Sequence, residues 1–177
     1  EFNEELSEEY LFTLNMLKGQ CYRENRYYRD ALEVYKSLKE GAGSLDKSKI
    51  LCININIIGI YILLRDNRNI RKHIDESLVL ISSNRQLYKE KHGAEIFSGL
   101  AKGFKFISED ERAAEYYNHA IYSAKRNKQY EILTDALENL FEIFEKKKAV
   151  NPKTNCYKKL FSQIKHKSLS TMQHQPL

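Results

Sequence analysis

The feature that most constrains this chain is a spacing of large and small apolar residues in the segment 97–120, FSGLAKGFKFISEDERAAEYYNHA. Apolar residues there fall at i, i+3, i+4 and i+7, and a second set follows after a polar break. The first set is Phe97, Leu100, Ala101 and Phe104, and the second is Ala113, Tyr117 and Ala120. Because Ala101 and Ala113 are small, two antiparallel helices can approach closely there. The segment therefore predicts a helical hairpin.

An earlier segment repeats this spacing. Gly19 and Ala31 are 12 residues apart, as are Ala101 and Ala113, so residues 15–38 predict a second hairpin of the same kind.

A middle segment fits the spacing less well. Gly59 takes the small position of its first helix, but Arg71 stands 12 residues later, where a second small residue is expected. We therefore predict a shifted second helix whose buried stripe is Ile70, Ile74, Leu78 and Ile81. Gly19, Gly59 and Ala101 follow one another at intervals of 40 and 42 residues, and we expect a tight interhelical contact at each.

The polar break in 97–120 contains a signal for a helix start. Ser108 is followed three residues later by Glu111, which matches a capping box, in which the hydroxyl and the carboxylate each accept from a free backbone amide. We expect Ser108 to be the N-cap of the second helix.

The composition favours helices. Among 177 residues there are only 7 Gly and 2 Pro, which leaves few tight turns for a many-stranded sheet. We predict an all-α fold of about eight helices paired as antiparallel hairpins, with the last pair incomplete or acting as a cap. The predicted helices are 4–23, 27–40, 45–65, 68–83, 86–107, 109–126, 128–148 and 152–167. We expect 1–167 to form a single domain and 168–177 to be a disordered tail.

Cysteine usage and hydropathy favour a cytoplasmic protein without membrane contact. The longest apolar run, IIGIYILL at 57–64, is shorter than the roughly 18 residues of a membrane span. Cys21, Cys52 and Cys156 lie far apart, as is typical of a reducing compartment. Because the sequence opens with Glu1 rather than Met, we expect a fragment or trimmed form of a longer chain.

The sequence carries no catalytic or metal-binding pattern. It has no Gly-rich phosphate loop, no nucleophile elbow and no paired His and carboxylate, and its five histidines do not cluster at ligand spacing. We predict that the protein is not an enzyme and uses no metal or cofactor.

The net charge of +5 is concentrated at one end. Residues 145–177 hold eight Lys and one acid, a balance of +7, whereas the remainder has 21 basic and 23 acidic residues, a balance of −2. This end is interpreted as a solvated helix face and tail, or as a patch for nucleic acid or an acidic partner.

The pattern F-x2-L-A-x2-F followed by A-x3-Y-x2-A resembles the tetratricopeptide (TPR) consensus. With its period of 40–42 residues, the segment 10–145 is similar to the C-terminal domains of bacterial peptide-pheromone regulators of the Rap, PlcR and NprR type. The resemblance implies a TPR-like solenoid, a right-handed superhelical stack of hairpins. It also implies a concave groove, lined by the first helix of each hairpin, that binds a short extended peptide. In such receptors Asn side chains hold the peptide backbone, because an amide offers both a donor and an acceptor.

The candidate groove residues lie three before, one after and four after the small residue of each first helix. Among them and on the seventh helix, we select as peptide-binding residues Gln20, Arg23, Asn56, Ser98, Lys102, Lys105, Glu138 and Asn139. Asn56 is of most interest, because an amide inside an apolar helix destabilises the fold unless it is paired. The alternatives are an Asn56 that bonds to a neighbouring helix or is exposed, and basic residues that are ordinary solvated charges.

These observations lead to a functional hypothesis. We expect a peptide- or protein-binding module, namely the ligand-sensing domain of a transcriptional regulator that responds to a bacterial signalling peptide. Its partner would be a short peptide or an extended protein segment. Two alternatives are a TPR scaffold for protein–protein interaction and a nucleic-acid-associated regulator that acts through the basic C-terminal end. DNA binding through a domain absent from this chain and a homodimer are also left open.

Overall fold

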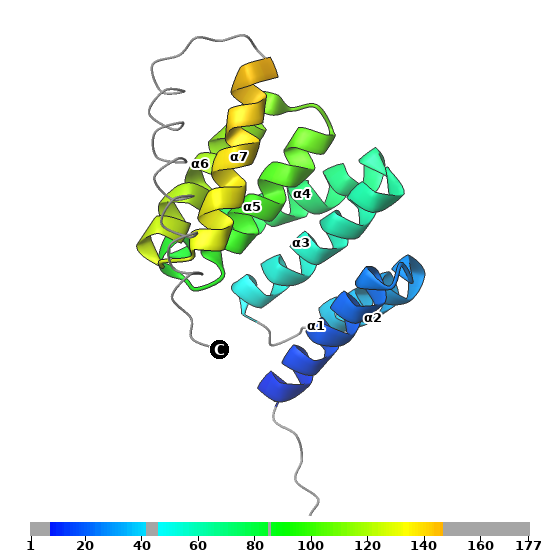
Figure 1. Cartoon of the computed structure of the whole chain (residues 1–177). Helices are drawn as coiled ribbons and strands as arrows, with labels where there is room; N and C mark the ends of the chain where they lie inside the picture. The colour runs from blue at the N-terminus through cyan, green and yellow to red at the C-terminus, as the bar shows by residue number, and fades with distance from the viewer. Residues whose placement is uncertain (1–7, 42–45, 85, 147–177) are drawn as a thin grey trace, which may run out of the picture. The chain divides into compact units, whose positions relative to one another are not determined.

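The computed structural model of the chain describes residues 8–41, 46–84 and 86–146. These residues form seven α-helices and one short 3-10 helix, and no strand occurs among them (Figure 1). The prediction of an all-α fold is therefore confirmed for the described part of the chain. The chain divides into two compact units, unit 1 up to Asn84 and unit 2 after it.

Unit 1 consists of two helical hairpins. Its helices are α1 (Glu8–Glu24), α2 (Tyr28–Glu40), α3 (Lys47–Leu64) and α4 (Asn67–Ser82). Helix α1 packs on α2 and α3 packs on α4, and α2 also packs on α3. The apolar stripe of α4 is buried at Ile70 and Ile74.

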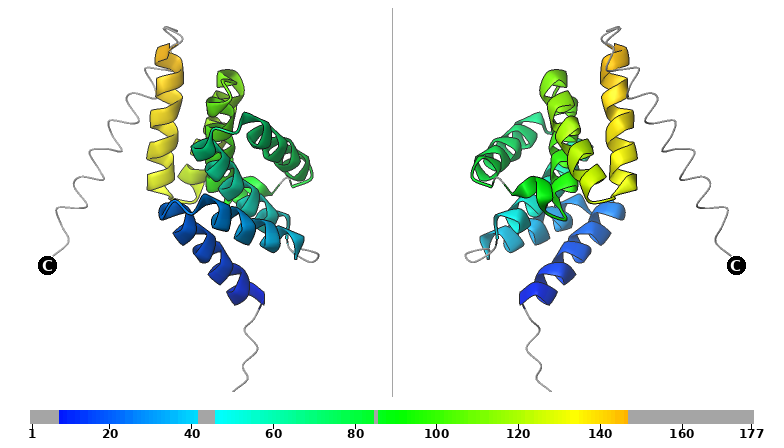
Figure 2. Two further views of the ribbon diagram at one scale, coloured as in Figure 1. Left: turned by 90° about the vertical axis from the view of Figure 1, so that its right-hand side faces the viewer. Right: turned by 90° about the vertical axis from the view of Figure 1, so that its left-hand side faces the viewer.

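Unit 2 contains three helices in succession. They are α5 (Gly93–Phe106), α6 (Asp110–Arg126) and α7 (Tyr130–Lys146), preceded by the 3-10 helix η1 (Leu87–Lys89). Helix α6 packs against both α5 and α7 (Figure 2). The short helix η1 lies against α5 and α6.

One predicted helix is wrong at its start. The sequence predicts a single helix over 86–107, but the chain is extended at Glu90, between η1 and the first residue of α5, Gly93. The reason is a close backbone approach, because a Cβ atom on Gly93 would lie only 2.1 Å from the carbonyl oxygen of Leu87. The predicted helix 152–167 and the tail 168–177 lie outside the described residues.

Four helix connections share one turn geometry. In each, the preceding helix ends at a residue with positive φ, and the next amide donates to the carbonyl five residues back, as in a Schellman motif. The positive-φ residues are Arg26, Arg65, Ser108 and Lys128, with φ of 65, 56, 64 and 57°. The bonds are Tyr27 N to Tyr22 O, Asp66 N to Tyr61 O, Glu109 N to Phe104 O and Gln129 N to Ala124 O, at 2.8 to 3.0 Å. The next helix begins two residues after each positive-φ residue.

This turn corrects the predicted capping box. Ser108 is not an N-cap but the left-handed residue that ends α5, and Glu109 is the N-cap of α6, without a side-chain capping bond. The serine stands one position too early, because the Schellman turn needs a residue of its own before the new helix can start.

The turn also corrects the expected contact at Gly59. Gly19 and Ala101 each lie seven residues before their left-handed residue, and the residue at that distance from Arg65 is Ile58. Ile58 is fully buried, whereas a Cβ atom on Gly59 would have only Arg23 Nη1 within 4 Å, at 3.8 Å. In the second hairpin the small residue is therefore one residue closer to the turn than in the other two. Counting 12 residues from Gly59 gives Arg71, whereas counting from Ile58 gives the buried Ile70.

At three equivalent buried positions of the hairpins, large side chains are combined with small ones. Counted from the left-handed residue, positions −7, +5 and +9 hold Gly19, Ala31 and Tyr35, then Ile58, Ile70 and Ile74, then Ala101, Ala113 and Tyr117. All of these positions are buried. A large tyrosine at +9 is thus matched by two small residues, and three isoleucines take the place of that combination in the second hairpin.

Helix α3 is the one described helix that is long and apolar enough to cross a membrane by length and composition alone. It packs against α2 and α4, with 44% of its residues buried, and the core helix of a water-soluble protein meets the same two criteria.

We expect Gly19→Ala to lower the free energy of unfolding by about 1–3 kcal/mol, because overpacking a core forces side chains out of place. The new Cβ atom would lie 2.6 Å from Cζ of Tyr35, whose ring is fully buried. The matched control is Gly59→Ala, which we expect to raise stability by about 0.5–1 kcal/mol, since alanine is the better helix former. Urea unfolding of both variants measures the difference, and an unchanged or stabilised Gly19→Ala would contradict the packing described here.

Candidate functional site

Of the three residues predicted in unit 1, Arg23 on α1 and Asn56 on α3 are in contact. Asn56 Oδ1 accepts from Arg23 Nη1 on α1 at 3.4 Å and from the Tyr35 hydroxyl on α2 at 3.3 Å. Its Nδ2 donates to the carbonyl of Cys52 at 2.9 Å. Gln20 is exposed and donates to Glu24 of its own helix at 2.9 Å. Asn56 therefore bonds to neighbouring helices, and its half-buried amide ties α1, α2 and α3 together.

A second buried amide, Asn54, joins α2, α3 and α4. Its side chain is fully buried; Oδ1 accepts from Lys39 Nζ at 2.9 Å and Nδ2 donates to the Ser77 hydroxyl at 3.2 Å. Lys39 also pairs with Glu76 at 2.5 Å. Because both amide ends are satisfied inside the protein, Asn54 is a structural link between the two hairpins of unit 1.

His73 lies beside this network and is kept neutral. Its ring stacks on Tyr61 with centroids 5.8 Å apart, and Nδ1 is 3.3 Å from Glu76 Oε2 without hydrogen-bond geometry. Burial lowers the pKa of His73 to about 4, and the nearby Lys39 adds to this, against the opposing effect of Glu76. The pKa of Glu76 is itself lowered: its burial acts to raise it, but the bond from Lys39 outweighs that effect.

The predicted residues of unit 2 form a polar surface between α5 and α7. Lys102 Nζ on α5 is 2.9 Å from Asp135 Oδ2 on α7, and the Ser98 hydroxyl lies 3.3 Å from the same oxygen. Lys105 Nζ bonds Asn139 Oδ1 at 2.8 Å and Glu142 Oε2 at 2.5 Å.

Four residues predicted separately are thus brought together: Ser98, Lys102, Lys105 and Asn139. Glu138, the fifth predicted residue of this unit, is exposed on α7. Asp135 and Glu142 were missed. The signal that identifies them is their spacing, because Asp135 and Glu142 lie four before and three after Asn139 on one helix face.

The hydroxyl of Tyr117 on α6 is buried beside this surface. Among the described residues it has no hydrogen-bond partner. Burial raises the pKa of Tyr117, and the carboxylates of Asp135 and Glu142 raise it further. Tyr117 stands at the same hairpin position as Tyr35, whose hydroxyl does bond a residue of the following helix, Asn56.

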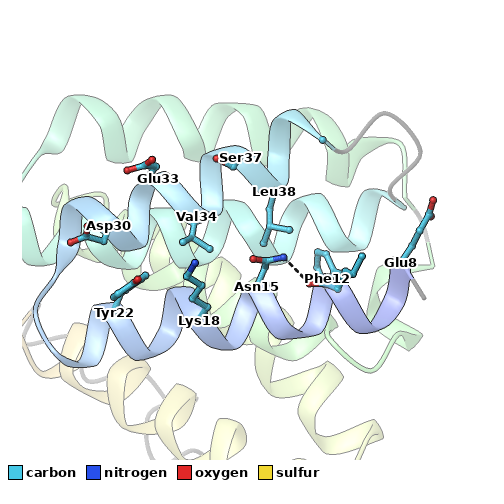
Figure 3. A pocket seen from close by; sticks show the side chains of 12 residues that line it. Glu8, Phe12, Asn15, Lys18, Tyr22, Asp30, Glu33, Val34, Ser37 and Leu38 are labelled. Atoms are coloured by element: carbon cyan, nitrogen blue, oxygen red, sulfur yellow. Dashed lines mark hydrogen bonds between the residues drawn. The ribbon is translucent and has the colours of Figure 1, made fainter. Parts of the chain in front are cut away.

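An open groove of about 570 Å³ runs along the α1–α2 hairpin (Figure 3). It is lined from α1 by Glu8, Leu11, Phe12, Asn15, Lys18 and Tyr22 and from α2 by Asp30, Glu33, Val34, Ser37, Leu38 and Gly41. Figure 3 shows Asn15 and Lys18 on α1 facing Val34 and Leu38 on α2. None of these residues was selected from the sequence.

The described residues contain no group of three or more His, Cys, Asp or Glu that could hold a metal ion. Cys21 is exposed and Cys52 is half-buried.

Comparison with known proteins identifies a similar fold. No protein-family model matches the sequence, and no curated protein matches it. The solved structure of BtubC (BKLC) from P. vanneervenii matches 99% of this chain and 70% of its own, with a TM-score of 0.71 and 14% sequence identity. At that identity the likeness shows a shared helical fold.

We expect unit 1 to lose stability as the pH falls through the range set by His73. The folded-state pKa of about 4 lies below the ordinary histidine pKa of 6.5, so the stabilisation is present above pH 6.5 and is lost as the pH falls toward 4. Between pH 7 and 5 this residue should lower the free energy of unfolding by about 2 kcal/mol.

Urea unfolding at the two pH values, with His73→Gln beside the wild type, measures this contribution. The variant should show a smaller fall by that amount, whereas the matched variant His92→Gln, at an exposed histidine, should retain the wild-type fall. Equal falls in the wild type and His73→Gln would contradict a neutral buried His73.

Proposed function

We propose that this chain is a TPR-like solenoid module that binds a short peptide or an extended protein segment, without catalysis. The observation that carries the proposal is the polar surface between α5 and α7. Ser98, Lys102 and Lys105 of α5 were selected by their position in the repeat, and they bond Asp135, Asn139 and Glu142 of α7 there.

This surface has the chemistry that an extended backbone needs. The Asn139 amide accepts from Lys105 and donates to Asp135, and a peptide unit that displaced these partners could take both its donor and its acceptor. The pair of Lys102 and Asp135 is about half exposed, and such pairs contribute roughly 0–1 kcal/mol. A ligand can therefore exchange them at small cost, offering a carboxylate to Lys102 or a donor to Asp135.

In unit 1, Asn56 and Arg23 supply a similar set of groups. The 3.4 Å bond from Arg23 to Asn56 is long, and breaking it would release both a guanidinium and an amide oxygen for a ligand. The Tyr35 hydroxyl would continue to hold the Asn56 side chain in place.

We further propose that the module is the ligand-sensing part of a regulator that responds to a bacterial signalling peptide. The support is the hairpin repeat, in which the left-handed residues Arg26, Arg65 and Ser108 follow one another at 39 and 43 residues, and the position of polar residues on first helices. A scaffold that binds a protein segment is the alternative, and it would use the same surface. The basic end at 145–177, on which the nucleic-acid alternative depends, lies mostly outside the described residues.

We expect Lys102→Ala and Lys105→Ala each to weaken peptide binding roughly tenfold, as loss of one charge-assisted contact does. The ligand is first selected from a display library of extended peptides against the whole chain, and affinity is then measured by calorimetry. The matched control is Lys125→Ala, at an exposed lysine of α6 in the same unit, which should bind as the wild type does. If all three variants bind alike, or no peptide is selected, the proposal fails.

A further inference from the structure

One face of the first hairpin is exposed, whereas the equivalent face of each later hairpin is buried. Counted back from the left-handed residue, position −12 holds Leu14, Ile53 and Ile96 in the three hairpins. Ile53 and Ile96 are fully buried, whereas Leu14 is 48% exposed. Tyr10, Leu11 and Leu17 on the same helix are also exposed, and Gly19 is the only buried residue of α1. A helix derives most of its stability from packing an apolar face, and within the described part of unit 1 nothing packs over Leu11, Leu14 and Leu17 of α1.

The structure itself contains an example of what such a face receives. In unit 1, α2 packs on α3 and inserts Lys39 between Asn54 on α3 and Glu76 on α4. The residues equivalent to Asn54 and Glu76 in the first hairpin are Asn15 and Ser37, and both line the α1–α2 groove. The groove of the first hairpin is therefore equivalent to the surface of the second hairpin on which α2 packs.

In the third hairpin this face is closed by aromatic rings. Phe97, equivalent to Asn15, lies 6.3 Å from Tyr116, which is equivalent to Val34, and both belong to one cluster with Phe104. In the first hairpin the ring at the position of Phe104 is retained as Tyr22, but Asn15 and Val34 replace the other two rings and leave the open volume of about 570 Å³. The groove is therefore specific to the α1–α2 hairpin.

The charge of the groove indicates the sign of its partner. Glu8, Asp30 and Glu33 line it against a single cation, Lys18. None of these three carboxylates has an ion-pair partner among the described residues. The side-chain nitrogen of Asn15 donates to the Leu11 carbonyl of its own helix at 2.9 Å. The side-chain oxygen of Asn15 remains as an acceptor, as that of Asn54 is for Lys39.

We propose that the α1–α2 groove binds an amphipathic, basic α-helix of a partner protein. The partner's apolar stripe would cover Leu11 and Leu14, and a lysine or arginine would reach Asn15 in the way that Lys39 reaches Asn54. This is helix-in-groove recognition, with the acidic rim fixing the partner's charge. The inference does not depend on the peptide surface between α5 and α7, which lies in the other unit.

The test uses a capped peptide derived from α2, YRKALKVYKSLKK. It retains the apolar residues and both lysines of α2, including Lys39, but carries Lys in place of Asp30, Glu33 and Glu40. We expect saturable binding to the whole chain by calorimetry, with at least a fivefold loss of affinity when salt rises from 0.05 to 0.5 M, as screening requires (roughly threefold shorter Debye length). A scrambled peptide of the same composition should not bind.

Two variants test the groove separately. Leu14→Asp places a charge on the exposed apolar face of α1 beside the groove, Glu33→Lys reverses a charge that lines the groove, and each should weaken binding roughly tenfold. Their matched controls are Val79→Asp and Asp75→Lys, at exposed residues of α4 in the same unit, which should leave binding unchanged. Circular dichroism checks that helicity is retained, and Glu33→Lys, at an exposed residue, keeps the test valid if Leu14→Asp unfolds the protein.

The remaining outcomes also decide the question. Absence of saturable peptide binding, or binding that neither groove variant weakens, would overturn the proposal. Light scattering of the whole chain gives a further arm, because a dimer that forms with concentration and is lost in Glu33→Lys would assign the groove to a second copy instead. A monomer that binds the peptide through Leu14 and Glu33 supports the proposed partner helix.

Discussion

The hairpins of this protein depend on one backbone constraint, the left-handed residue that ends the first helix of each pair. A single residue at positive φ, followed by a bond to the carbonyl five residues back, fixes where one helix stops and the next begins. Because the turn has constant length, it also fixes which side chains of the two helices meet. The buried sets at positions −7, +5 and +9 from Arg26, Arg65 and Ser108 follow from it.

The residues that occupy this position explain why helices were easier to predict than their register. Arg26, Arg65 and Lys128 carry side chains that ordinarily avoid positive φ, at a cost of roughly 1–2 kcal/mol, and nothing in their type marks them as turn residues. Gly59 is a stronger signal by residue type, but it lies one residue after Ile58, which occupies the packed position seven residues before Arg65. Apolar periodicity therefore predicts seven helices well, whereas the packing register of the second hairpin is set by a residue that sequence rules overlook.

The candidate site shows the same division between pattern and context. Repeat spacing predicted that Lys102 and Lys105 lie on one side of a first helix, and Asn139, which was selected only as a polar residue of the seventh helix, bonds Lys105 there. The spacing gave no indication that Arg23 and Tyr35 both bond Asn56, since those partners come from other helices. Which amides are occupied depends on contacts between elements, and a single sequence does not encode those contacts in its spacing.

Asn54 of α3 and Asn15 of α1, which take the same position in successive hairpins, show how a repeat can assign different tasks to one residue type. Asn54 is fully buried and joins three helices, and its equivalent in the first hairpin, Asn15, lies at the floor of an open groove. Removing a partner from a buried amide costs about 1–3 kcal/mol, so Asn54 can keep its place only while Lys39 and Ser77 are present. Asn15 bears no such constraint. At an inner hairpin the polar position locks one helical pair to the next, and at the first hairpin the same position remains available to a group from outside the described chain.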